Sequence, residues 1–525
     1  MSARTRNRDG DTVTGSLGDP RRINVIRDGL AAALLVAGLL LPWNLRAGLG
    51  IPGTAGWVAA VVIVASMLSL AAVVLRFRGG YDESDASRTR AVLLTAPYLV
   101  VAGGFVAVTV VQSVRFGGSG AVPPGIGPGV WFGSAGAVLA ALPPAALAEN
   151  DSRWSADKAL RVVGIGSIVL ASAATVFNLY WRTRFVIPHI GDPGTGAQNS
   201  VVVVAAVLYA VAALVPVLIV GRWMMSGDAS ARLATVLLGA ATVLGGAAVW
   251  ILPVGRELDA FHGIAQNTST AGVGFEGFLA WAVGAALVGT VVALGAPQWR
   301  AASRRCLLLI AVWCGASALE RIVDLISVSV LDLPAPPYSG TALMAFDLVV
   351  AVLAVWLYLN HGARSAVPQT VSALLLGILA TLTICRVILG VALAARVQPL
   401  NATDINSVYG NTQVQQLTGT FDVVLCVVAL ALLAVAFTAR ARPAQPRRVR
   451  VAPDSVTSYT LADDGSVVVA ADVAATDTAT VRIARPQTGS AGQDSAEDRV
   501  AAVLAESTRR FAAGTTYGAG TTKDR

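Results

Sequence analysis

Long apolar stretches recur along this chain from about residue 28 to residue 438, and short polar segments separate them. A helix that crosses a bilayer needs about 20 mostly apolar residues. Twelve stretches reach or approach that length. The pattern therefore predicts an all-α polytopic integral membrane protein with about 12 transmembrane helices. The expected spans are 28–44, 55–75, 91–113, 129–148, 159–181, 200–221, 231–252, 274–296, 304–330, 341–360, 369–395 and 417–438.

Prolines interrupt some of these spans. Pro143 and Pro144 lie in the fourth and must bend or end it, because proline has no backbone N–H to donate. Pro97 and Pro216 lie inside the third and sixth. Membrane helices tolerate such prolines where neighbouring groups satisfy the freed carbonyls.

The distribution of basic residues between alternate loops predicts the orientation. One side of the expected topology carries 24 Lys and Arg residues, and the opposite side carries six. Loops rich in Lys and Arg stay in the cytoplasm. We therefore expect a bacterial inner-membrane protein whose N- and C-termini are both cytoplasmic.

An internal duplication is suggested by prolines at a nearly constant spacing of 211 to 213 residues. The matching positions are Pro42 and Pro253, Pro123-Pro124 and Pro336-Pro337, and Pro188 and Pro399. They fit two parallel six-helix halves, 23–222 and 223–438, an arrangement found in some transporters. The alternative is chance, because outer loops are rich in proline in any case.

The two ends of the chain are polar. Residues 1–22 are expected to form a disordered cytoplasmic N-terminus. Residues 439–525 begin with a basic run suited to anionic lipid, and 458–473 then has the pattern strand, Asp-Gly turn, strand. A third strand at 478–484 and a short helix after Ser495 are also expected. This tail is either a binding site for a protein partner or a small, weakly ordered extension.

Composition excludes several classes of function. Only 13% of residues are charged and the mean hydropathy is +0.66, whereas soluble domains carry about 25% charged residues. The net charge of +8 comes from inter-helix loops and the segment after the last span, so we expect no nucleic-acid partner. All four cysteines fall in predicted spans and all three histidines in loops, so we expect neither a disulfide framework nor a metal site. We expect no cofactor, and we expect a protein without catalytic activity in preference to a membrane-embedded transferase.

Charged residues inside the spans are concentrated in the second half of the chain. Each such group costs roughly 2.5–3.5 kcal/mol at the centre of a bilayer, so it must meet a partner or water. From the direction of each span, these groups lie at a similar depth in the outer half of the membrane. The candidate site comprises Glu320, Arg321, Asp324, Asp347, Arg386 and Asp422.

Two interpretations of this cluster remain open. Glu320, Asp324 and Asp347 outnumber Arg321 and Arg386, even before Asp422 is counted. A surplus carboxylate in a low dielectric can take up a proton or accept a cationic substrate. In the alternative, the groups form a fully paired structural network in which Arg386 bridges Asp324 and Asp347.

Twelve spans in two halves resemble the major facilitator superfamily in outline, and that resemblance implies a secondary transporter. The family's basic signature is absent from the loop 76–90, and the first outer loop, 44–56, lacks the acidic pair of polytopic glycosyltransferases. No Walker motif occurs, so ATP is not the expected energy source. We expect a permease for a small molecule or proton. The alternative is a membrane scaffold or assembly factor for a cell-envelope complex.

Overall fold

The computed structural model describes most of the apolar part of the chain. The described residues are 20–44, 47–48, 54–79, 84–116, 125–143, 151–251, 273–289, 296–330, 340–361, 367–393, 419–441, 459–461 and 467–469. The structural statements below concern these residues. The remaining residues include nearly all of the expected N-terminal segment, the expected third strand and the expected helix after Ser495.

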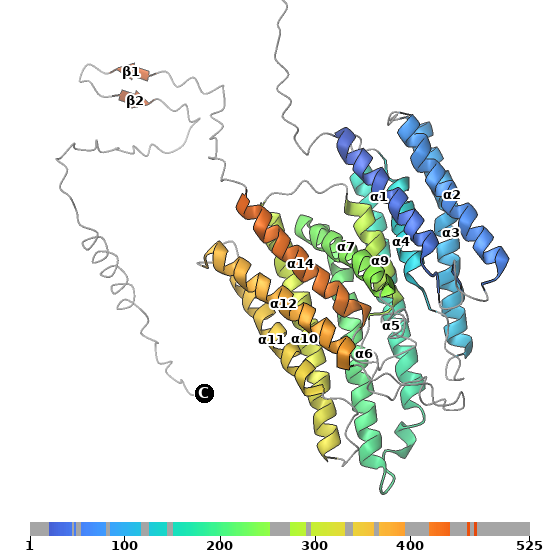
Figure 1. Cartoon of the computed structure of the whole chain (residues 1–525), viewed down its shortest axis with the longest axis vertical. Coiled ribbons are helices and arrows are strands. Elements are labelled where there is room, and N and C mark those ends of the chain that lie inside the picture. The colour runs from blue at the N-terminus through green and yellow to red at the C-terminus, as the bar shows by residue number, and fades with distance from the viewer. Residues whose placement is uncertain are drawn as a thin grey trace, which may run out of the picture. The chain divides into compact units, whose positions relative to one another are not determined.

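Within these residues the chain forms twelve α-helices, one in each predicted span (Figure 1). They are α1 (Pro20–Leu40), α2 (Gly56–Arg78), α3 (Asp85–Phe116), α4 (Pro128–Ala141), α5 (Asp151–Thr183), α6 (Gly196–Met225), α7 (Ala229–Ile251), α9 (Phe275–Val288), α10 (Ala296–Val330), α11 (Gly340–Asn360), α12 (Gln369–Leu393) and α14 (Thr420–Ala441). A 3-10 turn, η2 (Ile187–His189), precedes α6. Ten of the helices are long and apolar enough to cross a membrane. The prediction of a helical membrane protein is confirmed.

The other two helices, α4 and α9, have only 14 residues each and are buried along almost their whole length. Each begins after a glycine with extended backbone, Gly127 or Gly274. Glycine also allows α1 to approach α4 closely, since a Cβ at Gly38 would lie 2.6 Å from the backbone nitrogen of Gly133. Small residues allow helices in membranes to pack backbone against backbone in this way.

Contacts between helices include three closed rings of four consecutive helices, and these rings also pack on one another, α4 on α9 and α7 on both α10 and α14. In the first ring α1 packs on α2 and α4, and α3 packs on α2 and α4. Helices α5, α6, α7 and α9 form a second ring, and α10, α11, α12 and α14 form a third. The arrangement as two six-helix halves stays a prediction.

Aromatic side chains join the three rings in the core. The Trp131 ring of α4 lies 4.9 Å from Phe278 of α9, centroid to centroid. Trp281, also on α9, lies 5.4 Å from Phe421 of α14, which in turn lies 4.7 Å from Trp313 of α10. All five side chains are almost completely buried. Aromatic pairs at these separations add about 0.5–1.5 kcal/mol each beyond the burial of their area.

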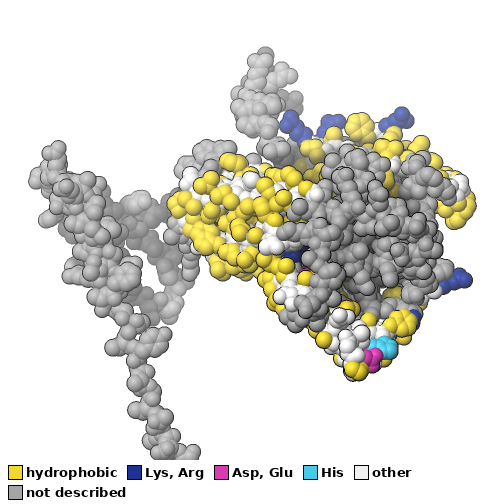
Figure 2. Space-filling view, turned by 60° about the horizontal axis from the view of Figure 1, so that its bottom comes forward, with side chains coloured by type: hydrophobic (Ala, Val, Ile, Leu, Met, Phe, Trp, Pro, Cys, Tyr) yellow, Lys and Arg dark blue, Asp and Glu magenta, His cyan; other side chains and the backbone are white. Residues whose placement is uncertain are grey.

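The outside of the bundle is apolar. Large side chains such as Trp57, Val100 and Leu374 are each more than 60% exposed, a pattern suited to contact with lipid rather than water. In Figure 2, hydrophobic side chains cover much of the described surface, and Lys and Arg side chains lie mainly at its edges.

Charged groups at the ends of the helices connect neighbouring segments. Asp228, between α6 and α7, accepts a hydrogen bond from the Ser230 hydroxyl at 2.6 Å and pairs with Arg305 of α10 at 2.6 Å. The Ser230 hydroxyl and then Arg305 lower the pKa of the Asp228 carboxyl. His361 follows α11, and burial together with the Arg300 and Arg304 side chains lowers its pKa.

The tail belongs to a separate unit, residues 445–525. Its strands β1 (Tyr459–Leu461) and β2 (Val467–Val469) pair antiparallel, with Thr460 opposite Val468. The predicted hairpin is thereby confirmed. An isolated hairpin of this size has marginal stability in water.

Candidate functional site

One face of α10 supplies several polar groups to the third ring. Trp313, Ser317, Glu320, Arg321 and Asp324 follow one another at helical spacing. They extend toward the end of the bundle where α10 and α12 end and where α11 and α14 begin. The four helices therefore bring polar groups together at this end of the bundle.

Asp347 of α11 lies at the centre of this charge cluster and has no exposed surface. Its Oδ2 accepts a hydrogen bond from Arg321 Nε at 2.9 Å, and its Oδ1 accepts one from Arg386 Nε. Each carboxylate oxygen thus has its own guanidinium partner. A buried carboxylate tolerates complete loss of water only with compensation of this kind.

Asp422 pairs with a second nitrogen of the Arg386 guanidinium. Its Oδ1 accepts hydrogen bonds from Arg386 Nη1 and, at 2.6 Å, from the indole Nε1 of Trp313. Its Oδ2 accepts the backbone N–H of Gly419 at 3.3 Å, as an acidic residue in the first turn of a helix commonly does. The position at the start of α14 also favours negative charge through the helix dipole.

Arg386 therefore bridges Asp347 and Asp422. A bridge to Asp324 was the alternative expected from the sequence, but Asp324 is bonded elsewhere. The Tyr209 hydroxyl of α6 is 2.9 Å from Asp324 Oδ1 and 2.8 Å from Oδ2. This contact could not be predicted from the sequence, because Tyr209 is a single tyrosine in an apolar run 115 residues before Asp324.

Glu320 differs from the other acids of the cluster. Its side chain is only 5% exposed, yet its Oε1 accepts no hydrogen bond from any described residue. The structure also shows no salt bridge from Glu320 to a described basic side chain. In total, Arg321 and Arg386 lie among four carboxyl groups, so the cluster holds more acids than bases.

A second buried charge group lies in the first ring and was missed by sequence reasoning. Asp28 Oδ1 is 3.2 Å from Arg27 Nη2 and 3.0 Å from Arg76 Nη1, and all three residues are at most 6% exposed. Arg76 also donates to the carbonyl of Ala140, and Arg27 to that of Pro143, at the end of α4. Both arginines had been assigned to a loop by topology, although Asp28 beside Arg27 in a predicted span was a signal.

No metal centre accompanies these clusters in the described part of the chain. Among those residues, no group of three or more His, Cys, Asp and Glu side chains is placed to hold an ion. All four cysteines are free thiols, and Cys314 lies one residue beyond Trp313, beside the charge cluster.

Comparison with known families places the chain in one of them. The sequence profile of a family described as "Domain of unknown function (DUF7937)" matches residues 24–442. The chain belongs to this family. The match takes in all twelve helices except the extreme start of α1 and excludes most of the tail. No curated protein matches the chain, and no solved structure does either.

Proposed function

We propose that this protein is a secondary transporter of the bacterial inner membrane and that its site is the charge cluster on α10, α11, α12 and α14. The observation that carries the proposal is Glu320, an acid buried among apolar helices without an ion-pair partner among the described residues. An ionised carboxylate in such a position is costly, so the group binds a proton or a cationic substrate.

The paired and unpaired acids have different roles in this proposal. Asp347 pairs with Arg321 and Arg386, Asp422 pairs with Arg386, and these ion pairs connect α10, α11, α12 and α14. Glu320 and Asp324 have no ion pair with a described base, and among the described residues Asp324 accepts its hydrogen bonds from the neutral Tyr209 hydroxyl. These two acids are therefore the groups that exchange a proton or contact a cation, and the basic loops keep both termini in the cytoplasm.

Proton movement in proteoliposomes tests this function. Full-length protein is reconstituted with a trapped pH-sensitive dye and exposed to panels of small amines, amino acids and sugars. We expect one class of compound to drive proton movement through the wild-type protein. Asp192→Asn, which changes a surface carboxyl to an amide, is the control and should show the same movement. Glu320→Gln should show less than a tenth of it. Equal movement through folded Glu320→Gln would overturn the proposal.

A scaffold role is the second candidate, favoured by the separate unit formed by residues 445–525 and its hairpin. A lone hairpin gains stability when it docks on another protein. If the tail is a scaffold, an envelope protein that co-purifies with the full chain should no longer do so after truncation at Ala439. Glu320→Gln should have no effect on that complex. Retention of every co-purifying protein after truncation would exclude this role for the tail.

A further inference from the structure

Two contacts fix how α6 and α10 lie against each other. The Tyr209 hydroxyl of α6 donates to Asp324 of α10 at 2.8 Å. Asp228, just after the end of α6, pairs with Arg305, near the start of α10, at 2.6 Å. The two contacts are 19 residues apart along α6 and the segment after it, and they are also 19 residues apart along α10. The two helices therefore run antiparallel in register, since each rises by about 1.5 Å per residue.

This register places Glu320 beside small side chains of α6. Glu320 precedes Asp324 by one helical turn. Ala213 follows Tyr209 by one turn on the same face, so Ala213 lies at about the level of Glu320. Ala210 and Ala213 are both at most 2% exposed. Methyl groups at these positions leave the backbone of α6 close to the acid.

Pro216 frees a backbone oxygen at the same level. In a regular α-helix the N–H of residue 216 would bind the carbonyl of Ala212, but proline has no N–H. Pro216 and Ala212 both lie on the buried side of α6. The Ala212 carbonyl therefore lacks its usual intrahelical donor where α6 packs in the bundle. Carbonyls released from a membrane helix coordinate Na⁺ in some transporters.

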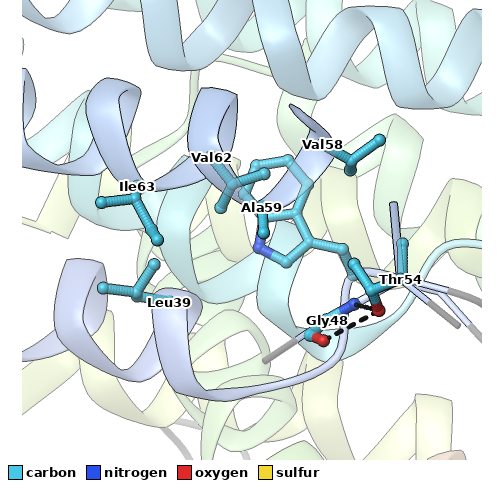
Figure 3. A pocket seen from close by; sticks show the side chains of 9 residues that line it. Leu39, Gly48, Thr54, Val58, Ala59, Val62 and Ile63 are labelled. Carbon is cyan, nitrogen blue, oxygen red and sulfur yellow. Dashed lines mark hydrogen bonds between the residues drawn. The ribbon is translucent and has the colours of Figure 1, made fainter. Parts of the chain in front are cut away.

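A tight polar contact elsewhere in the bundle gives a comparison. In a small cavity of about 10 Å³ between α1 and α2, the Thr54 hydroxyl donates to the Gly48 carbonyl at 3.0 Å and accepts the Gly48 N–H at 3.2 Å (Figure 3). The described residues that line this cavity include no acid. Its polar atoms satisfy one another, whereas the buried Glu320 Oε1 accepts no hydrogen bond from a described residue. A buried oxygen without a donor indicates a bound ion or water.

We propose, building on the transport function above, that the cation taken by Glu320 is Na⁺ and that it binds between α6 and α10. Glu320 Oε1 and the Ala212 carbonyl are ligands from opposite helices at one level. Asp324 and the Tyr209 hydroxyl, whose oxygen keeps lone pairs after donating, complete the site one turn away. All four ligands are oxygens, which suit a hard cation.

Both the space and the charge favour a monovalent ion. The Tyr209 hydroxyl reaches from α6 to Asp324, so an organic ammonium would have to displace it, whereas a single atom would not. Two neighbouring carboxyls in a low dielectric do not readily ionise together, so Glu320 and Asp324 offer one negative charge, which Na⁺ or a second proton neutralises. Asp324 is partly exposed near the end of α10, and it gives the ion a route to the more deeply buried Glu320.

Binding of radiolabelled Na⁺ to the purified full-length protein in detergent tests this site without requiring transport. We expect one saturable site per chain, from which unlabelled Na⁺ displaces the label and choline does not. Glu320→Gln and Asp324→Asn should each weaken binding about tenfold or more, because each removes a charged ligand. The surface variant Asp192→Asn should bind as the wild type does.

Proline variants test the backbone ligand without touching an acid. Pro216→Ala returns an N–H to the Ala212 carbonyl and makes α6 regular, so the protein should fold and bind Na⁺ several-fold more weakly. Pro97→Ala is the matched control, since Pro97 is also inside a long helix, α3, away from the charge cluster. Equal binding by Pro216→Ala and Pro97→Ala would overturn the proposed site.

The outcomes separate the sodium site from the transport function. Wild-type protein that binds no Na⁺, or Glu320→Gln that binds it equally well, would overturn the sodium site. Proton movement that depends on Glu320 when choline replaces Na⁺ would then still support transport. Conversely, Na⁺ binding that depends on Glu320 and Pro216, in a protein that moves no substrate, would support the ion site and refute the transport function.

Discussion

Arg386 is the side chain on which most of the buried charge of the third ring depends. It joins Asp347 and Asp422, which lie on different helices and are at most 5% exposed. Removing one partner of a buried pair leaves an uncompensated charge and typically costs about 3–5 kcal/mol. Glu320 shares no ion pair with a described base, so removing its charge should not carry this cost.

This contrast gives a stability prediction. Arg386→Met should lower the free energy of unfolding by about 3–5 kcal/mol, because two carboxylates lose a guanidinium. Glu320→Gln should change it by less than about 1 kcal/mol, since the acid has no salt bridge to lose. Thermal unfolding in detergent, followed by tryptophan fluorescence, measures both. The reverse order of the two effects would mean that the cluster is paired differently.

Among single residues, sequence reasoning found the acids and arginines of the cluster because charge in an apolar run is conspicuous. It could not find Tyr209, whose hydroxyl is unremarkable in a membrane helix until Asp324 lies 2.8 Å away. It also misplaced Arg27 and Arg76. Counting basic residues loop by loop predicts the orientation of the chain in the membrane. It does not distinguish exposed arginines from arginines that donate hydrogen bonds to helix carbonyls.

At the scale of elements, apolar length was sufficient to predict where each helix lies. It was not sufficient to predict how α4 packs in the first ring, which depends on glycine at individual positions. Gly38 of α1 faces the backbone of Gly129 and Gly133, with a Cβ at Gly38 only 2.6–2.9 Å from their atoms. The helices can approach this closely because Gly38 has no side chain.

Substitution at Gly38 tests that contact. Gly38→Ala should destabilise the protein by about 1–3 kcal/mol, because α1 and α4 must move apart. Gly29→Ala is the control on the same helix, as a Cβ there meets nothing within 4 Å, and it should be neutral or slightly stabilising. Thermal unfolding in detergent compares the two variants. Equal stability would show that α1 and α4 do not pack at this distance.

At the scale of the whole molecule, the short helices α4 and α9 link the three rings. They begin 147 residues apart, and each follows a Gly-x-Gly sequence, 125–127 and 272–274. Trp131 and Phe278 occupy corresponding positions, and their rings contact each other at a tilt of 38°. The proline spacing of 211 residues predicts two six-helix halves, and this second spacing of 147 residues fits a four-helix unit. Both units contain an even number of helices. We therefore expect an even number of crossings in each repeat.

Cysteine accessibility in intact cells tests the crossing by α4, which at 14 residues is only about 21 Å long. Ser84 precedes α3 and His189 follows α5, so three helices lie between these two exposed positions. In a Cys385→Ser background, an impermeant maleimide should label His189→Cys and should label Ser84→Cys only after lysis. If α4 does not complete a crossing, both positions lie on one side of the membrane and are labelled alike. Labelling of Ser84→Cys alone would instead invert the orientation that the basic loops predict.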